Sequence, residues 1–309
     1  MYNFSTQQKK YALGNITIGG QPGENPTVLM GTVFYGKRYR DMTAQIREEV
    51  EEYVQKQKEI SEETGNPGIL DVFVDSEEHI PERLGMMLDL IDPKEPFSVD
   101  IPEAEVRIAA LEWLSQQGEL HRVIYNSINL GITEEEKRCL GEHTPGASIV
   151  LGYNPRDSST DGRLAILDNG AGLVEGGLIK TAKDAGIEKI LLDTAATSFG
   201  NFSAEALRAV PAMKSKWGYP VGCSIHNTVE SWKWLRQKRK DDPTLYKVCD
   251  IGSNGPLIVL GANWLVYGPV SSAPIAFPFA AMMDIIISEG AEEYFAISHS
   301  EKHPRERLM

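Results

Sequence analysis

Four segments of the sequence end in polar side chains at the point where a buried strand normally enters a turn. Each segment begins as a short apolar run and then places a carboxylate or a carboxamide at its carboxyl end. These residues are Asp100, Asn126, Asp193 and Asn227, the last directly after His226. The carboxyl ends of parallel barrel strands open into one mouth, where barrel enzymes carry out their chemistry. The spacing therefore predicts one polar pocket built from separate strands.

Acceptors and amides of this kind suit a flat heterocycle that carries N–H groups along one edge. A carboxylate accepts two parallel N–H donors, as it does from arginine, and a carboxamide can both donate and accept. A pterin ring presents such an edge. Polar residues also commonly close strand ends without binding anything, which explains any one of these positions adequately but all four together less well.

Other barrel chemistries are less well supported by the sequence. A Schiff-base enzyme needs a lysine at the mouth, whereas Lys189 opens its strand at the opposite end. Only His79 and His226 can reach the mouth, too few for a zinc site. The sequence contains no Gly-x-Ser-x-Gly elbow around Ser224 or elsewhere. We expect no metal, and a hydrolase that uses carboxylates around one metal ion remains an alternative.

The polar tips require a repeated order of strand and helix. The predicted strands are rich in Val, Ile and Leu without alternation, as expected for parallel strands buried on both faces. They cover residues 27–34, 69–75, 97–101, 122–128, 147–153, 189–193, 221–225 and 264–267. Eight strand–helix units over about 250 residues predict a TIM (β/α)8 barrel of the α/β class.

Helix boundaries follow from capping residues and glycines. The predicted caps are Asp41, Thr133 (in a capping box with Glu136), Ser203 and Thr228, and the first helix ends at 65–68. A long loop is predicted before a helix at 173–185, and an apolar helix at 275–287 ends the barrel.

The first 26 residues contain a weakly alternating segment, 11–20, which predicts a hairpin that plugs the bottom of the barrel. Residues 1–309 are interpreted as a single barrel domain that includes this hairpin, residues 1–26. A doubly wound sheet is the alternative, but it needs a glycine-rich turn directly after an early strand. The glycines at 170–177 lie far beyond theirs.

Composition narrows the class of partner and compartment. The formal net charge is −13, which disfavours binding to a phosphate backbone. No run reaches about 18 uninterrupted apolar residues, and the amino-terminal segment lacks the apolar core of a signal peptide. The three cysteines are widely spaced and fit reduced thiols. We therefore expect a cytoplasmic protein with no membrane segment and no nucleic-acid partner.

Several runs resemble one protein family over essentially the whole chain. They are residues 19–29 (Gly-Gly-Gln-Pro-Gly-Glu-Asn-Pro-Thr-Val-Leu), 64–67 (Thr-Gly-Asn-Pro), His226-Asn227 with Glu230 and Trp232, and 266–269 (Val-Tyr-Gly-Pro). The sequence resembles the MtrH family of tetrahydromethanopterin S-methyltransferase. Within it, the chain is most similar to the methylcorrinoid:tetrahydrofolate methyltransferases of glycine betaine demethylation. The resemblance implies a pterin-binding barrel, as in dihydropteroate synthase.

The resemblance also assigns roles to residues. Asp100, Asn126 and Asp193 match pterin-anchoring positions, and Asp71 matches an aspartate of the second strand that could instead serve the core. Asn227 falls where the wider superfamily places an asparagine beside pterin N5. A two-residue offset in the segment 223–227 leaves His226 as the other candidate for that contact.

The implied reaction moves a methyl group from methylcob(III)alamin to N5 of tetrahydrofolate. The sequence has no Asp-x-His-x-x-Gly motif for holding a corrinoid, so we expect a separate corrinoid protein as partner, and the family implies a homodimer. The basic loop 36–40 could contact the substrate tail or simply be solvated. Tetrahydromethanopterin as acceptor, or a module that only binds a pterin, remain alternatives, and the direction of transfer stays open.

Overall fold

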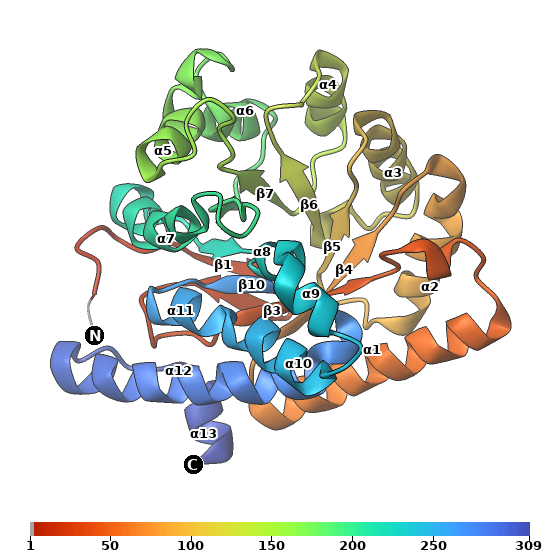
Figure 1. The fold of residues 1–309 in the computed structure, drawn as a ribbon. Coiled ribbons are helices and arrows are strands. Elements are labelled where there is room, and N and C mark those ends of the chain that lie inside the picture. The colour runs from red at the N-terminus through yellow and green to blue at the C-terminus, as the bar shows by residue number, and fades with distance from the viewer. Residues whose placement is uncertain (1–2) are drawn as a thin grey trace.

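Eight parallel strands close a barrel in the computed structural model, which describes residues 3–309 (Figure 1). The strands pair in the order β10-β3-β4-β5-β6-β7-β8-β9. They are β3 (Val28–Val33), β4 (Gly68–Phe73), β5 (Phe97–Asp100), β6 (Val123–Ile128), β7 (Ala147–Leu151), β8 (Ile190–Asp193), β9 (Val221–Cys223) and β10 (Trp264–Pro269). The predicted TIM-barrel fold is confirmed.

Helices surround this barrel on the outside (Figure 1). They are α1 (Ala44–Thr64), α2 (Ile80–Leu90), α3 (Ala104–Gln116), α4 (Glu134–Glu142), α5 (Thr160–Asp168), α6 (Leu178–Asp184), α7 (Ser203–Trp217), α8 (His226–Ser231), α9 (Lys233–Lys238), α10 (Pro243–Gly252), α11 (Asn254–Val259), α12 (Ala273–Phe295) and α13 (Pro304–Leu308). Single-turn 3-10 helices connect several of them. The apolar faces of α1, α2 and α3 pack on β4 and β5, while α5, α6, α7 and α12 cover the other side.

The barrel interior is apolar at one end and polar at the other. Successive residues of a strand point to opposite faces, so in β4 Ile69 and Asp71 both point inward while Leu70 joins the outer core. Ile69 belongs to a buried cluster that fills the amino-terminal end of the barrel. One inward position further along, the side chain becomes a carboxyl group. The polar residues therefore form the top layer of an otherwise packed interior.

A small hairpin closes the amino-terminal end of the barrel. It consists of β1 (Lys10–Leu13) and β2 (Ile16–Gly19), which pair antiparallel. Leu13 and Ile18 are buried in the same cluster as the inward residues of the barrel strands. The hairpin thus occupies the position predicted for a plug.

Two of the sequence runs that carry the family resemblance also lie at this end and have a structural role. The buried carboxyl group of Asp284 in α12 accepts hydrogen bonds from the Thr27 backbone N–H at 2.9 Å and the Thr27 hydroxyl at 2.8 Å. Asn66 donates to the same carboxyl group at 2.7 Å. These contacts tie α12 to the starts of β3 and β4.

Three of the predicted helix caps are wrong. Thr43, not Asp41, caps α1, and its hydroxyl accepts from the Ile46 backbone N–H at 3.3 Å. Ser203 is the first helical residue of α7 rather than its cap. Thr228 lies inside α8 and donates its hydroxyl proton to the Thr197 carbonyl. The capping box of Thr133 and Glu136 is confirmed.

Parts of the predicted connections are also helical. The expected long loop before residue 173 contains α5, and the helix predicted at 173–185 is shorter, α6. Residues 233–259 form three short helices that the sequence pattern does not predict.

One described segment, residues 270–295, is long and apolar enough to cross a membrane, contrary to the expectation from uninterrupted apolar runs. The signal is weak, because a helix that covers a protein core passes the same test, and α12 packs against α1 and α11.

Candidate active site

The polar layer at the mouth is centred on Asp71. Its carboxyl group is buried and accepts hydrogen bonds from the Thr32 hydroxyl at 3.1 Å and from the Asn126 carboxamide at 3.3 Å. Asp100 lies beside Asn126 in the register of β5 and β6 and keeps partial contact with solvent. The structure therefore brings together three of the predicted residues, and Asp71 links them instead of serving only the core.

The register of β6 explains how Asn126 reaches this layer. The pairing of β6 with β7 shifts between Tyr125 and Ile128, and such an irregularity re-aims the side chains beside it. Asn126 shares the inward face with Ile124, whereas Tyr125 points to the outer core.

The carboxyl groups of the layer are costly to ionise. Burial raises the pKa of Asp71, opposed by hydrogen bonds that include those from Asn126 and Thr32. Burial and then the charges of Asp71 and Asp193 raise the pKa of Asp100 well above its usual value, and Arg107 opposes them. Burial raises the pKa of Asp193 to about 6. A ligand that brings N–H donors would compensate this loss of hydration.

Asp193 ends β8 and is held by the backbone that follows it. Its carboxylate accepts the Ala195 backbone N–H at 2.6 Å, and Ala195 has a positive φ of 63°. The buried guanidinium of Arg163 in α5 donates to the carbonyl groups of Thr194 and Ala195. The sequence pattern does not single out Arg163, because the segment that carries it is expected to be a loop.

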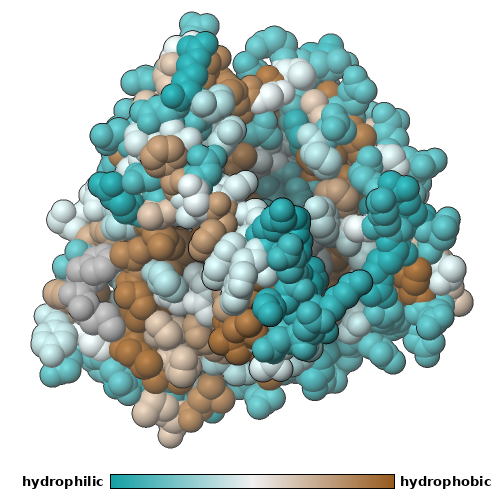
Figure 2. Space-filling model, in the orientation of Figure 1, coloured by the Kyte–Doolittle hydropathy of each residue, from teal (hydrophilic) through white to brown (hydrophobic). Residues whose placement is uncertain are grey.

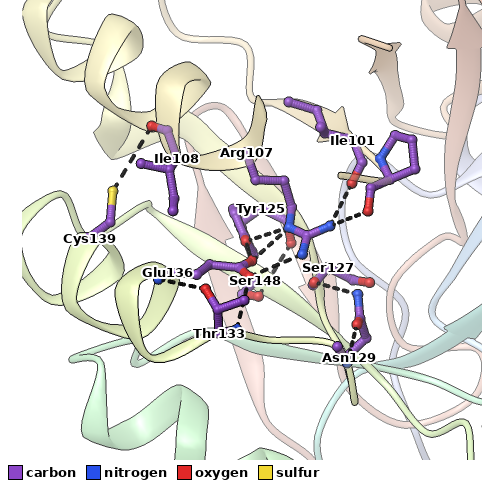
Figure 3. A network of polar contacts seen from close by, with 12 residues as sticks. Ile101, Arg107, Ile108, Tyr125, Ser127, Asn129, Thr133, Glu136, Cys139 and Ser148 are labelled. Carbon is purple, nitrogen blue, oxygen red and sulfur yellow. Dashed lines mark hydrogen bonds and ion pairs between the residues drawn. The ribbon is translucent and has the colours of Figure 1, made fainter. Parts of the chain in front are cut away.

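A second buried arginine organises the neighbouring strand ends (Figure 3). Arg107 of α3 forms an ion pair with Glu136 of α4, with Nε 2.6 Å from Oε1, and donates to the Tyr125 hydroxyl at 2.9 Å. It also donates to the carbonyls of Ile101 and Pro102 at 2.9 and 2.7 Å. Arg107 therefore fixes the chain after Asp100 and the strand that carries Asn126. From the sequence, Glu136 is recognised only as part of a helix cap.

His226 and Asn227 begin α8, a few residues after β9. His226 lies against Gly268 of β10, where a Cβ atom would be only 2.7 Å from its Nδ1. The same Nδ1 is 2.7 Å from Oδ1 of Asp250 in α10. The Asn227 side chain is exposed. Both predicted residues thus lie at the carboxyl ends of the strands, with His226 the more firmly held.

Within residues 3–309, no group of three or more His, Cys, Asp and Glu side chains is arranged to hold a metal ion. His79 bonds to Asp75 at 2.7 Å. The polar layer instead offers carboxyl groups and a carboxamide at the end of a closed barrel, which is an arrangement for binding a heterocycle edge.

Comparison with known proteins decides the family. The family model described as "Tetrahydromethanopterin S-methyltransferase MtrH subunit" matches residues 6–297. The chain belongs to this methyltransferase family. It is 41% identical over its full length to the full-length tetrahydromethanopterin S-methyltransferase H subunit of Methanothermobacter thermautotrophicus. It is 39% identical, again with both chains fully covered, to the H subunit of the putative methyltransferase mtx of Methanosarcina barkeri.

Solved structures of dihydropteroate synthases share the fold. The enzyme of Coxiella burnetii, in complex with pteroic acid, superposes with a TM-score of 0.59 at 16% identity, covering 91% of this chain and 100% of its own. The enzyme of Vibrio fischeri gives a TM-score of 0.62 at 12% identity, covering 91% and 99%. At these identities the likeness establishes the barrel fold and nothing finer.

Proposed function

We propose that this protein transfers a methyl group between a corrinoid and N5 of a tetrahydropterin bound at the mouth of the barrel. The observation that carries the proposal is the layer of acceptors formed by Asp71, Asp100, Asn126 and Asp193 in a chain of a methyltransferase family. Carboxyl groups withdrawn from water without an ion-pair partner need donors from a ligand. The amino group and ring N–H of a pterin supply two.

The identity of the pterin is the part of the sequence-based prediction that the relatives change. The sequence motifs favour tetrahydrofolate, with glycine betaine demethylation as the context. The relatives that are 41% identical to this chain are named for tetrahydromethanopterin, and this favours tetrahydromethanopterin as the pterin. Both cofactors share the ring edge that the polar layer would bind, so tetrahydrofolate is kept as the second arm of the test.

The chemistry of the transfer requires alignment more than activation. The N5 lone pair attacks the methyl carbon in line, and both electrons of the carbon–cobalt bond remain on cobalt. Holding the reactants in this geometry can remove several kcal/mol of the barrier. Asn227 at the start of α8 would orient N5 by a hydrogen bond without carrying charge. Asp71, Asp100, Asn126 and Asp193 would hold the ring.

The corrinoid would arrive on a partner protein, because this chain lacks a corrinoid-holding motif. Aromatic side chains offer a contact surface near the predicted mouth. Phe199 and Phe202, which follow β8, and Trp234, which follows β9, are exposed. Phe199 stacks on the half-buried Trp232 with ring centroids 4.4 Å apart. Large exposed apolar groups of this kind commonly mark interaction sites.

The predicted homodimer has a candidate interface on α12. Figure 2 shows hydrophobic side chains gathered over α11 and α12. Ile275, Met282 and Ile286 on the outer face of α12 are 41%, 49% and 50% exposed. In an antiparallel pair centred on Met282, the exposed Glu289 of each copy would lie near residue 275 of the other, at the positive end of its helix.

Replacement of Met282 with Glu would place two like charges at the centre of this pair. We expect the variant to be monomeric by light scattering at concentrations where the parent protein is dimeric. Val248, exposed on α10 and outside the α12 face, provides the matched control as Val248→Glu. A parent protein that is monomeric, or a dimer unaffected by Met282→Glu, would refute this interface.

The reaction itself is tested by mixing the protein with methylcob(III)alamin and each tetrahydropterin without oxygen. Formation of cob(I)alamin is followed by absorbance, and the methylated pterin is identified by mass spectrometry. We expect transfer, faster with tetrahydromethanopterin. Pterin binding with no demethylation, even when corrinoid proteins are supplied, would favour the binding module instead.

A further inference from the structure

His226 and Asp250 form a pair that the polar layer does not require. His226 Nδ1 is 2.7 Å from Asp250 Oδ1, and the two side chains are 14% and 4% exposed. The pair joins α8 to α10, two helices outside the barrel strands. A carboxyl group that is almost fully buried against one ring nitrogen fixes the orientation of that ring.

The backbone of β10 is shaped to receive this ring. Gly268 has φ of +101°, and the pairing of β10 with β3 shifts between Val266 and Gly268. A Cβ atom at position 268 would lie 2.7 to 2.9 Å from three ring atoms of His226. Only glycine permits this contact, and it places the imidazole at the carboxyl end of β10, on the mouth side of the barrel.

The other nitrogen of the ring is left for a substrate. Nε2 of His226 makes no hydrogen bond to any residue of the described range 3–309, while Nδ1 is occupied by Asp250. The charged and titratable groups near the pair are few. Glu230 of α8 bonds instead to Arg239 and to Tyr246 of α10, and β10 contributes only Gly268.

We propose that His226 and Asp250 are the proton-transfer pair for pterin N5, with His226 as the acid–base group and Asp250 as its positioning residue. This inference rests on the proposed function. When N5 takes the methyl group, it becomes a positively charged ammonium that still carries its proton. Nε2 of His226 accepts that proton, and the carboxylate of Asp250 stabilises the resulting imidazolium.

The same pair serves the reverse reaction. The imidazolium donates its Nε2 proton to N5 of the methylated pterin, which makes N5 a better leaving group. Cobalt(I) then attacks the methyl carbon, and the N5 lone pair departs with the carbon–nitrogen electrons. No further oxidant or reductant is needed in either direction.

The test is the pH dependence of single-turnover transfer in both directions. General acid–base groups typically contribute about 100-fold to 10,000-fold to a rate. We expect His226→Gln to lose at least about 100-fold in the reverse reaction and to lose the pH limb. Asp250→Asn should lose at least about tenfold, with its limb moved to lower pH, because the imidazolium has lost its carboxylate. Pterin affinity should change by less than about threefold in both variants.

Glu230→Gln is the matched control, since Glu230 lies on the same helix but makes no contact with His226, and it should keep the parent pH profile. NMR titration of the His226 ring without substrate gives a second measurement, in which Asp250→Asn should lower the midpoint. A parent enzyme that transfers methyl groups while Asp250→Asn keeps its rate and limb would overturn the pair alone. Absence of transfer by the parent protein would overturn the proposed function as well.

Discussion

Asp193 offers a test in which stability and binding should move in opposite directions. Asp193→Asn keeps the shape of the side chain, and the amide oxygen can still accept the Ala195 backbone N–H that now lies 2.6 Å from the carboxylate. What changes is the charge. Burial raises the pKa of Asp193 to about 6, against 3.8 for the free group. The folded protein therefore carries a penalty for ionising this residue at neutral pH.

The size of that penalty follows from linkage. Each pKa unit corresponds to about 1.4 kcal/mol, so the raised pKa of Asp193 destabilises the ligand-free fold by at most about 3 kcal/mol at pH 7. The folded chain binds more protons than the unfolded chain between about pH 4 and pH 6, and stability falls as the pH rises through that window. We expect Asp193→Asn to raise the free energy of unfolding by about 1 to 3 kcal/mol at pH 7. The gain should vanish near pH 4.

The same substitution should weaken pterin binding. An amide N–H would face a pterin donor where the carboxylate had accepted it, and a mismatched buried polar group costs about 1 to 3 kcal/mol. The dissociation constant should therefore rise roughly tenfold to a hundredfold. The parent protein itself should bind more weakly below about pH 6, as Asp193 becomes protonated.

Urea denaturation at pH 7 and pH 4 measures the first effect, and anaerobic titration calorimetry with each tetrahydropterin measures the second. Asp168→Asn is the control, because Asp168 is exposed and pairs only with Lys216 at the surface. Its stability should stay within about 0.5 kcal/mol of the parent. A folded Asp193→Asn protein with parent affinity for both pterins would remove Asp193 from the site.

Three further substitutions test separate parts of the structure. Glu136→Gln leaves the buried guanidinium of Arg107 without its ion-pair partner, and urea denaturation should show a loss of about 3 to 5 kcal/mol. Thr43→Ala removes the cap of α1 and should cost about 1 kcal/mol, whereas Ser203→Ala should cost less than about 0.5 kcal/mol in the same assay. Asn227→Ala should leave pterin affinity unchanged in calorimetry but slow single-turnover transfer by more than about tenfold, and parent-like rates would exclude Asn227.

The strand–helix order was predictable because buried parallel strands are short apolar runs and helices have a different period. Every predicted strand is present in the structure, with ends that differ by up to a few residues. Caps were harder to predict, since an Asp, Ser or Thr near a helix start is common. Only the backbone decides that Thr43 rather than Asp41 accepts an N–H. The helix α5 was missed because glycines and polar residues around it favoured a loop.

The site divides along a similar line. Asp100, Asn126 and Asp193 could be proposed from sequence because each follows an apolar run that ends at the mouth. Arg107, Arg163 and Asp250 could not, because they lie on outer helices and reach the site through tertiary contacts. No local pattern distinguishes a buried arginine on an amphipathic helix from an exposed one.

The interior of the barrel explains why the polar layer implies a ligand. In β4, Ile69 is packed in the apolar plug region, and one inward position further on Asp71 is equally buried. An apolar residue at that position would stabilise the fold, because the carboxyl group loses hydration and gains only neutral hydrogen-bond donors such as Thr32 and Asn126. Asp100, within range of its charge, adds to the cost. Groups that raise the energy of the ligand-free barrel are retained where a bound donor returns the loss, and the stability gain expected for Asp193→Asn measures that trade directly.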